Sequence, residues 1–451
     1  MGGESIRDQG RDREARRWNG VYLGLYLGYV ALGMALRWNG WLAFDHIWFV
    51  DAARHILDGS WRIYDFRPQD PSVLGIAPPD GLAYSYSPLT ALLMAPFVAL
   101  AAALQDSPLA ASVGGVDALA DRLIVFPLLV ADVLAMEQLR RLVRAWRPQV
   151  DEVALFLGIL PTLLLTGFLQ VSAQRDHQEG LVLLLLLTTL RVTPRHLVLG
   201  GVLAGLTLAA KQTSVLELLP IGAVLLWTGI AGRRAQPGVA RPLGGLLWGG
   251  LAAAVFGVVM LPPWLANKDA VIYAFLTQEQ RRVLSGPGLP VWIDQALKAG
   301  FGGDASGYGL WHDQLLRYSN PGLVLVAVVI VALVIAWNAR RGRPIGLVDS
   351  RLLALVALGG LLQIVLGKWV TGHYYQLPLA LVLLWDSVRV APRWPLVGLA
   401  GTLGFRAITV GVDLPTVPQV KDGLLFALFA WLAGATLRAA CRAEPDPRPA
   451  E

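Results

Sequence analysis

Residues Gln174–Leu187 read QRDHQEGLVLLLLL, a polar turn followed at once by an apolar run. Runs of similar composition recur along the chain, which is 55% hydrophobic and only 16% charged over its 451 residues. The mean hydropathy is +0.53. These values lie outside the range of soluble domains, and many runs are long enough to cross a bilayer as helices. The sequence therefore predicts an all-α polytopic membrane protein, with residues 1–451 forming a single integral membrane domain.

About twelve apolar segments are predicted as transmembrane helices, several of them short. They lie near residues 20–38, 121–139, 152–170, 180–192, 196–211, 213–230, 243–264, 321–337, 351–367, 375–388, 395–411 and 423–438. Arginine clusters occupy most of the short connections, and short basic loops stay on the cytoplasmic side. Both termini are therefore predicted to be cytoplasmic, including residues 1–19 and a polar, Pro-rich tail at 442–451. These clusters explain the net charge of +6 without a nucleic-acid partner.

One apolar run, Pro88–Leu104, does not fit this order of crossings. If it crossed the membrane, the arginine cluster at 140–147 would lie outside. We therefore predict a helix lying in the outer interface, begun by Pro88 and flanked by the aromatic residues Tyr84 and Tyr86, which favour headgroup depth. The alternative is a further transmembrane helix.

Two long outer loops follow from this threading, at residues 39–120 and 267–320. Five of the six histidines and every lysine fall on the outer side. Groups that can perform acid–base or phosphate chemistry near neutral pH are therefore concentrated there.

The first loop carries two acids, Asp45 and Asp51, on either side of Trp48 and Phe49. A carboxylate held against apolar rings is a better proton acceptor, because its charged form is disfavoured there. The alternative for each is an ordinary solvated loop acid.

The polar turn at 174–180 contributes Asp176, His177 and Glu179. They are interpreted either as a polar wall that faces the first loop and binds sugar hydroxyls, or as a simple exit turn in which acids suit the dipole of the following helix.

A third polar group, Lys368, His373 and Tyr374, lies between two apolar spans. Such donors and positive charge can hold a phosphate, although Lys and Tyr also serve as interfacial anchors. Arg281 and Arg282 in the second long loop are predicted to add phosphate contacts, with a solvated face as the alternative.

Cofactor chemistry is not indicated. Cys441 is the only cysteine, which excludes an intramolecular disulfide and a thiolate-rich metal site. The chain has no Walker loop, dinucleotide fingerprint or nucleophile elbow. A divalent cation held by Asp45, Asp51, Asp176, His177 and Glu179 is a weaker alternative, because no local spacing requires it.

The motifs of the first outer loop resemble those of a known superfamily. In chain order they are Asp45, Phe49, Ala52-Ala53, Gly59, Tyr64 and Tyr86-Ser87-Pro88-Leu89. This order resembles the GT-C glycosyltransferases that use lipid-phosphate sugars. It is most similar to glycosyltransferase family 87, which includes the polyprenyl-phosphate-mannose-dependent mannosyltransferase of phosphatidylinositol mannoside synthesis. The turn at 174–179, Lys211-Gln212-Thr213 and His373-Tyr374-Tyr375 also match. The chain departs from the family in having Ser87 where a proline is usual, and in its second acid, Asp51.

The resemblance implies a GT-C-like fold with about 12 transmembrane helices and interfacial helices in the first outer loop. It also implies inverting transfer of a sugar, best matched by mannose, from a polyprenyl-phosphate donor to a hydroxyl of a lipid or glycan acceptor at the outer face of the plasma membrane. The implied roles are general base for Asp45 (or Asp51), donor-phosphate binding for His373, Lys368, Tyr374, Arg281 and Arg282, and sugar or acceptor binding for Asp176, His177, Glu179, Tyr86 and Lys211.

Two other functions use the same substrate class. A transporter or flippase of lipid-linked saccharides would need ionisable residues inside the membrane, for which Asp132 and Glu217 are the candidates. A lipid-linked glycan polymerase or ligase would differ only in its donor.

Overall fold

The computed structural model describes residues 3–40, 46–65, 86–175, 177–230, 243–277, 284–301, 305–368, 370, 374–389, 394–411 and 418–442. Within these ranges the regular elements are helices. Their bounds are α1 Gly3–Trp38, α2 His46–Leu57, α4 Pro88–Ala103, α5 Pro108–Val113, α6 Val116–Leu123, α7 Val125–Trp146, α8 Glu152–Leu165, α9 Phe168–Arg175, α10 Glu179–Val192, α11 Leu197–Ala210, η1 Gln212–Ser214, α12 Val215–Ile230, α13 Gly244–Ala266, α14 Lys268–Ile272, η2 Tyr273–Thr277, α16 Leu289–Gly300, α17 Ala305–Arg340, α18 Ser350–Leu366, α19 Gln376–Val388, α20 Leu396–Gly411 and α21 Pro418–Cys441.

The chain is a multi-pass membrane protein. Five of the described helices are long and apolar enough to cross a bilayer, or six if a bent pair counts as one span. The prediction of about twelve spans is thus confirmed only in part. The other predicted segments are helical, but α11, α18, α19 and α20 are shorter. Nearly every residue of α18 and α19 is buried by neighbouring helices, and a helix apolar on all sides suits such a core.

The predicted span at 152–170 is not one continuous helix. The first part, α8, ends at Leu165, and α9 begins at Phe168 at an angle of 41°. Gly167 lies at the break with φ of +95°, a conformation that residues with a Cβ rarely adopt. The break directs α9 towards the polar turn that precedes α10.

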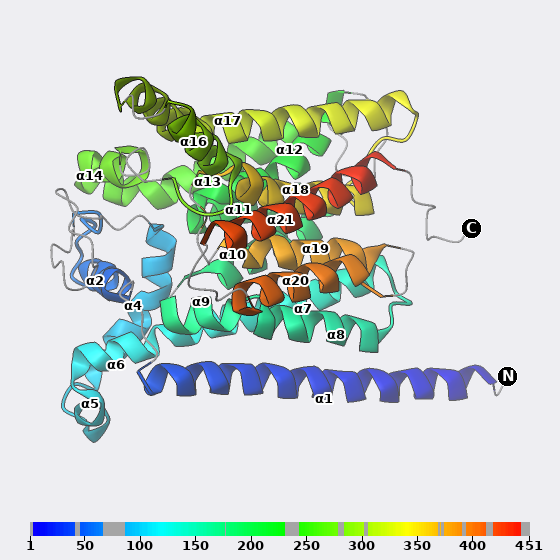
Figure 1. Ribbon diagram of the computed structural model, residues 1–451. Coiled ribbons are helices and arrows are strands. Elements are labelled where there is room, and N and C mark those ends of the chain that lie inside the picture. Colours follow the sequence, from blue (N-terminus) through cyan, green and yellow to red (C-terminus); the bar gives the residue numbers. More distant parts are fainter. Residues whose placement is uncertain are drawn as a thin grey trace.

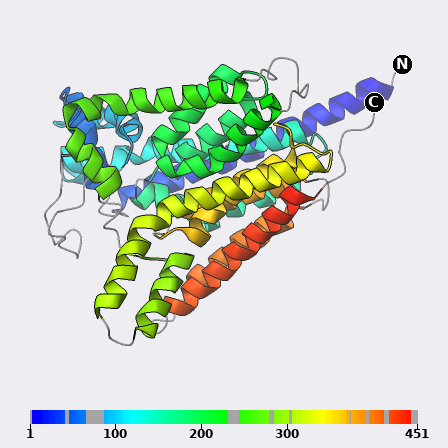
Figure 2. The ribbon, with the colours of Figure 1, turned by 90° about the horizontal axis from the view of Figure 1, so that it is seen from above.

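The long helices run side by side as a bundle (Figure 1), and the view from above shows the same arrangement (Figure 2). The start of α1 and the end of α21 lie at one end, here called the terminal end (Figure 1). The opposite end, here called the loop end, holds α2, α4, α5 and α6 (Figure 1). Within the bundle α11 packs on α13, α10 on α7, and α18 on α21.

The first loop is folded around a small core of its own. Phe49, Tyr64, Met94 and Leu119 are fully buried in it. The run predicted as a helix does begin at Pro88, where the Ser87 side chain accepts a hydrogen bond from the Leu89 backbone N–H. The resulting α4 packs on α2 and α6 and is steeply inclined to the bundle (Figure 1).

A buried arginine joins this first-loop unit to the bundle. Arg37, near the end of α1, is 0% exposed. Its guanidinium lies 2.7 Å from the Asp121 carboxylate of α6 and donates to the backbone oxygens of Asp121 and Ala173, at 2.9 and 3.1 Å. Since Ala173 belongs to α9, one side chain connects α1, α6 and the helix that leads to His177.

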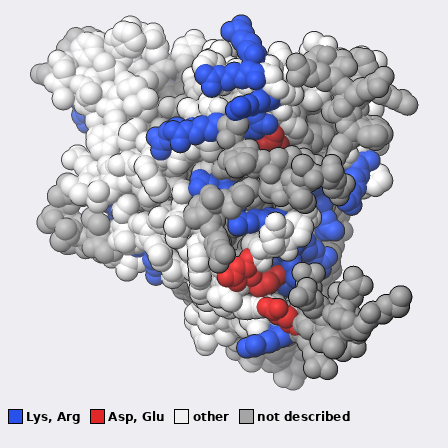
Figure 3. Space-filling view, turned by 90° about the vertical axis from the view of Figure 1, so that its right-hand side faces the viewer, with Lys and Arg blue, Asp and Glu red and all other residues white. Residues whose placement is uncertain are grey.

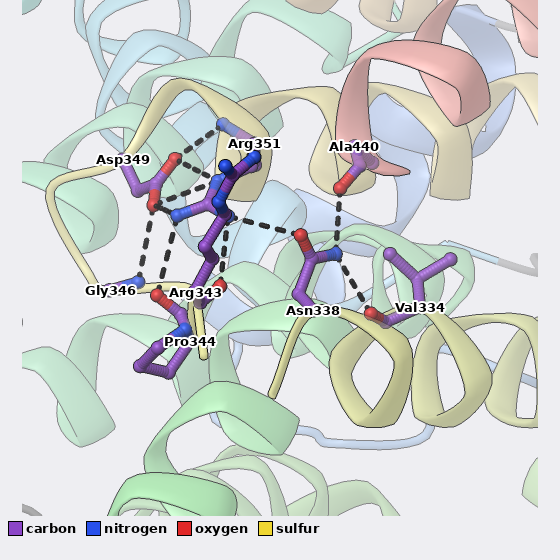
Figure 4. A network of polar contacts seen from close by, with 8 residues as sticks. All are labelled: Val334, Asn338, Arg343, Pro344, Gly346, Asp349, Arg351 and Ala440. Carbon is purple, nitrogen blue, oxygen red and sulfur yellow. Dashed lines mark hydrogen bonds and ion pairs between the residues drawn. The ribbon is translucent and has the colours of Figure 1, made fainter. Parts of the chain in front are cut away.

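At the terminal end, basic side chains gather while few acids are visible (Figure 3). A polar network there joins three helix ends (Figure 4). Asp349 accepts a hydrogen bond from the Arg351 backbone N–H in the first turn of α18, at 2.9 Å, and the Arg351 guanidinium donates to Asn338 of α17, at 3.0 Å. Asn338 in turn donates to the Ala440 carbonyl of α21, at 2.9 Å.

Candidate functional site

A cavity of about 680 Å³ lies at the loop end of the bundle. Its polar side is formed by the start of α10, the end of α11, η1 and the start of α12. Its apolar side includes Phe256, Met260 and Trp264, which are spaced four apart along one face of α13, and Leu323 and Val324 of α17. The cavity is therefore amphipathic, with polar groups at the helix ends and apolar groups along the helix flanks.

The local sequence explains why polar groups meet here. Glu179 is the first residue of α10, and Lys211 directly follows the last residue of α11. An acid at a helix N-terminus and a base at a C-terminus both suit the helix dipoles. The Lys211 ammonium lies 2.6 Å from Oε1 of Glu179 and 4.4 Å from the centre of the Tyr374 ring.

The first loop contributes a wall through Tyr86. A hydrogen bond of 3.3 Å joins the Tyr86 hydroxyl to Nε2 of His177, and both residues line the cavity. Two contacts with the first loop fix the position of Tyr86. Its ring centroid lies 4.6 Å from that of Phe49, and its backbone carbonyl accepts a hydrogen bond from the Tyr64 hydroxyl at 2.8 Å. The early part of α2 is thereby tied to the cavity.

Several buried polar atoms at this end have no hydrogen-bond partner among the residues that the structure describes. They include Oε2 of Glu179, Oε1 of Gln178 and Nε2 of Gln212, all from residues that line the cavity. Buried polar groups are usually satisfied. Unsatisfied acceptors and an unsatisfied donor in the lining of one cavity therefore mark a place where a polar ligand or water can bind.

Two further acids lie close to this polar end. Glu217 is the third residue of α12, is 0% exposed and lies against Gly360 of α18. Asp132 of α7 packs directly on Gly180, next to Glu179, and accepts from the Tyr29 hydroxyl at 2.7 Å. Both acids are thus at the level of the cavity, near the loop end of their helices.

The structure brings five of the predicted site residues together in the cavity lining. These are Tyr86, His177, Glu179, Lys211 and Tyr374. They combine two predicted roles: Tyr374 is predicted to bind the donor phosphate, and the other four are predicted to bind the sugar or the acceptor. Asp45, Asp176, Arg281, Arg282 and His373 lie outside the described residues.

The two other predicted residues do not line the cavity. Asp51 faces His55 one turn along α2, with 3.6 Å between its Oδ2 and Nε2 of the histidine. Burial raises the pKa of Asp51, while the charges of His55 and Arg54 lower it. Lys368 is buried and donates to the Leu316 carbonyl of α17 at 2.6 Å, but its neighbour Gly367 does line the cavity.

Sequence reasoning missed Gln363 and the apolar wall of α13. Gln363 is a polar residue inside the apolar helix α18, a signal that the sequence does contain. The apolar residues of α13 and α17 carry no such signal, because they look like any lipid-facing positions. As for metals, no three His, Cys, Asp or Glu side chains in the described part of the chain are placed to share an ion.

No protein-family model matches this chain, and no curated protein is significantly similar to it.

Proposed function

We propose that this protein is a GT-C type glycosyltransferase, which moves a sugar, mannose in the first instance, from a polyprenyl-phosphate donor to a hydroxyl of a membrane-associated acceptor. The observation that carries the proposal is the amphipathic cavity. Its apolar side is built from helices whose flanks face lipid: Trp264 is 45% and Val324 39% exposed. A substrate with a polyprenyl chain and a sugar head has the same division of polar and apolar parts.

The proposed orientation places the loop end at the outer face of the plasma membrane. Basic side chains gather at the terminal end (Figure 3), and short basic segments stay cytoplasmic. The cavity would then open on the outer side, with both termini inside, in a GT-C-like arrangement of about twelve helices with the first-loop helices in the outer interface.

The proposed reaction is a single displacement with inversion. An acceptor hydroxyl attacks the anomeric carbon, the bond from that carbon to the phosphate oxygen breaks, and polyprenyl phosphate leaves. Asp45, or Asp51 in its place, takes the hydroxyl proton. His373, Lys368, Tyr374, Arg281 and Arg282 are proposed to neutralise the leaving phosphate, and the residues around Glu179 to hold the sugar or acceptor.

The direct test is transfer by the purified protein in nanodiscs, with radiolabelled polyprenyl-phosphate-mannose and a membrane-lipid extract as acceptor. Label should move into a new lipid. Asp45→Asn should lower the rate by about 10²–10⁴, as loss of a general base does. Asp58→Asn, an exposed acid after α2, serves as the matched control.

The outcomes separate the two candidate bases. An active Asp45→Asn variant with an inactive Asp51→Asn variant would move the base to Asp51, and activity in both would refute the acid assignment. A parallel reaction with chelator tests the alternative of a bound cation. Failure with every polyprenyl-phosphate sugar would refute the transferase.

Buried Asp132 and Glu217 favour a second candidate, a flippase of lipid-linked saccharides, because ionisable residues inside membrane helices often serve transport. A flippase would move labelled lipid between the leaflets of proteoliposomes without changing it chemically. A glycan polymerase or ligase would instead consume a lipid-linked oligosaccharide.

A further inference from the structure

Lys211 is the one lysine or arginine among the described cavity-lining residues, and its charge is already matched. Its ammonium forms a 2.6 Å ion pair with Glu179 and rests on the Tyr374 ring. Both partners are largely shielded from water, with side-chain exposures of 13% for Lys211 and 2% for Glu179. A lysine held in this way has no excess positive charge to offer an anion.

The surroundings add negative rather than positive groups. Glu217 of α12 lies against Gly360 and is close enough to interact electrostatically with Lys211 and with Glu179. Asp132 lies behind Glu179, across Gly180, and also interacts with it. Three carboxyl groups therefore lie near one ammonium group, and no other lysine or arginine belongs to the described cavity lining. The phosphodiester of a polyprenyl-phosphate sugar carries one negative charge over two oxygens, and it is disfavoured here because the one ammonium group is already paired with Glu179.

The unsatisfied atoms point to a different ligand. Three buried atoms have no hydrogen-bond partner in the described part of the chain. Two are acceptors, Oε2 of Glu179 and Oε1 of Gln178, and one is a donor, Nε2 of Gln212. A sugar hydroxyl can donate to the first two and accept from the third, whereas an ionised phosphate can only accept. Hydrogen bonds to the charged Glu179 are the stronger kind.

We propose that the polar end of the cavity is a subsite for the hydroxyls of an uncharged sugar ring and that it excludes the phosphate. Lys211 then orients Glu179 for the sugar and is not a phosphate ligand. This deepens the proposed function and rests on it, because it states which part of the sugar phosphate occupies this end.

The test uses two probes with the same alkyl chain, tritiated octyl β-mannoside and octyl phosphate, bound to the full-length protein in nanodiscs. Glu179→Gln and Lys211→Met should each weaken binding of the mannoside about tenfold to hundredfold, the effect of losing a charged hydrogen bond. Lys211→Met should leave binding of octyl phosphate within about twofold of the wild type. Glu217→Gln should not weaken binding of the phosphate.

The controls keep a folding defect apart from a binding defect. Asp294→Asn changes an acid of α16 that does not line the cavity, and it should bind both probes as the wild type does. Lys211→Arg keeps the charge beside Glu179 and should recover mannoside binding better than Lys211→Met. The two probes also check each other, because a misfolded variant would lose both.

The subsite proposal would be overturned if Lys211→Met lost binding of octyl phosphate while it still bound octyl β-mannoside as the wild type does. It would also be overturned if the wild-type protein did not bind the mannoside. Sugar transfer without the predicted binding pattern would overturn the subsite and leave the transferase standing. If the predicted binding pattern is seen but no polyprenyl-phosphate sugar is transferred, the transferase is refuted and the sugar subsite stands.

Discussion

Asp51 lies on α2 with one face against the first-loop core, and burial raises the pKa of its carboxyl group. The folded protein therefore holds this proton more tightly than the unfolded chain does. The contribution of Asp51 to the free energy of unfolding is therefore fully present below the usual aspartate pKa. It is lost as the pH rises through the higher pKa of the folded state. The neighbouring charges of His55 and Arg54 reduce this effect without reversing it.

Replacing the carboxyl with an amide removes this dependence. Asp51→Asn is expected to unfold at a higher temperature than the wild type at pH 7, and the gap should shrink as pH falls towards 4. Thermal unfolding in detergent between pH 4 and 8 measures it. The exposed Asp58→Asn should show a smaller gap at every pH, and a constant gap for Asp51→Asn would contradict the assignment.

Among elements, the contact of α10 with α7 brings Glu179 of the cavity close to the buried Asp132. Gly180 makes this contact close: a Cβ there would lie 2.7 Å from the backbone N of Asp132 and 2.8 Å from its Cα. These are backbone atoms, so no side-chain rotation can relieve the clash. The helices must separate, and Glu179 must move with α10.

Gly180→Ala is therefore expected to destabilise the protein by about 1–3 kcal/mol, the usual cost of overpacking. Gly250→Ala on α13 is the matched control, since a Cβ there meets nothing within 4 Å. The control should be neutral or slightly stabilising, because alanine favours helix more than glycine does. Equal unfolding temperatures for the two variants would show that the α7–α10 packing is looser than described.

Helix positions could be read from the sequence because apolar runs between arginine clusters leave few alternatives. A proline at a helix start is a further signal, and α4 does begin at Pro88. Sequence could not place the break at Gly167, since a glycine in an apolar run is common within membrane helices. Nor could it tell that α18 and α19 are buried by protein rather than lipid, because both environments select apolar residues.

For the whole molecule, the separation of charge along the bundle predicts its orientation. The terminal end is expected to face the cytoplasm and the loop end the exterior. With Cys441 replaced by serine, a cysteine at exposed Asp58 should react with a membrane-impermeant maleimide on intact cells. A cysteine at exposed Glu14 should react only after the cells are permeabilised. The opposite labelling pattern would invert the molecule and place the cavity inside.

The assembly of the cavity from distant segments is also a property of the whole chain. The polar residues could be predicted as a set, since His177, Glu179 and Lys211 flank apolar runs. Their meeting with Tyr86 of the first loop and with Tyr374 near α19 depends on packing that no local pattern encodes. The roles assigned to Asp45 and His373 remain predictions, because these residues lie outside the described structure.

The buried guanidinium of Arg37 also sets an order for biosynthesis. Its partners Asp121 and Ala173 follow it by 84 and 136 residues, so at typical elongation rates α1 waits roughly ten seconds for the last of them. Until then the nascent α1 must keep its charge among the lipid headgroups, as long basic side chains near helix ends do. The first helix to leave the ribosome is thus held in full only once α9 has been made, and a chain truncated before α9 lacks the contact with Ala173.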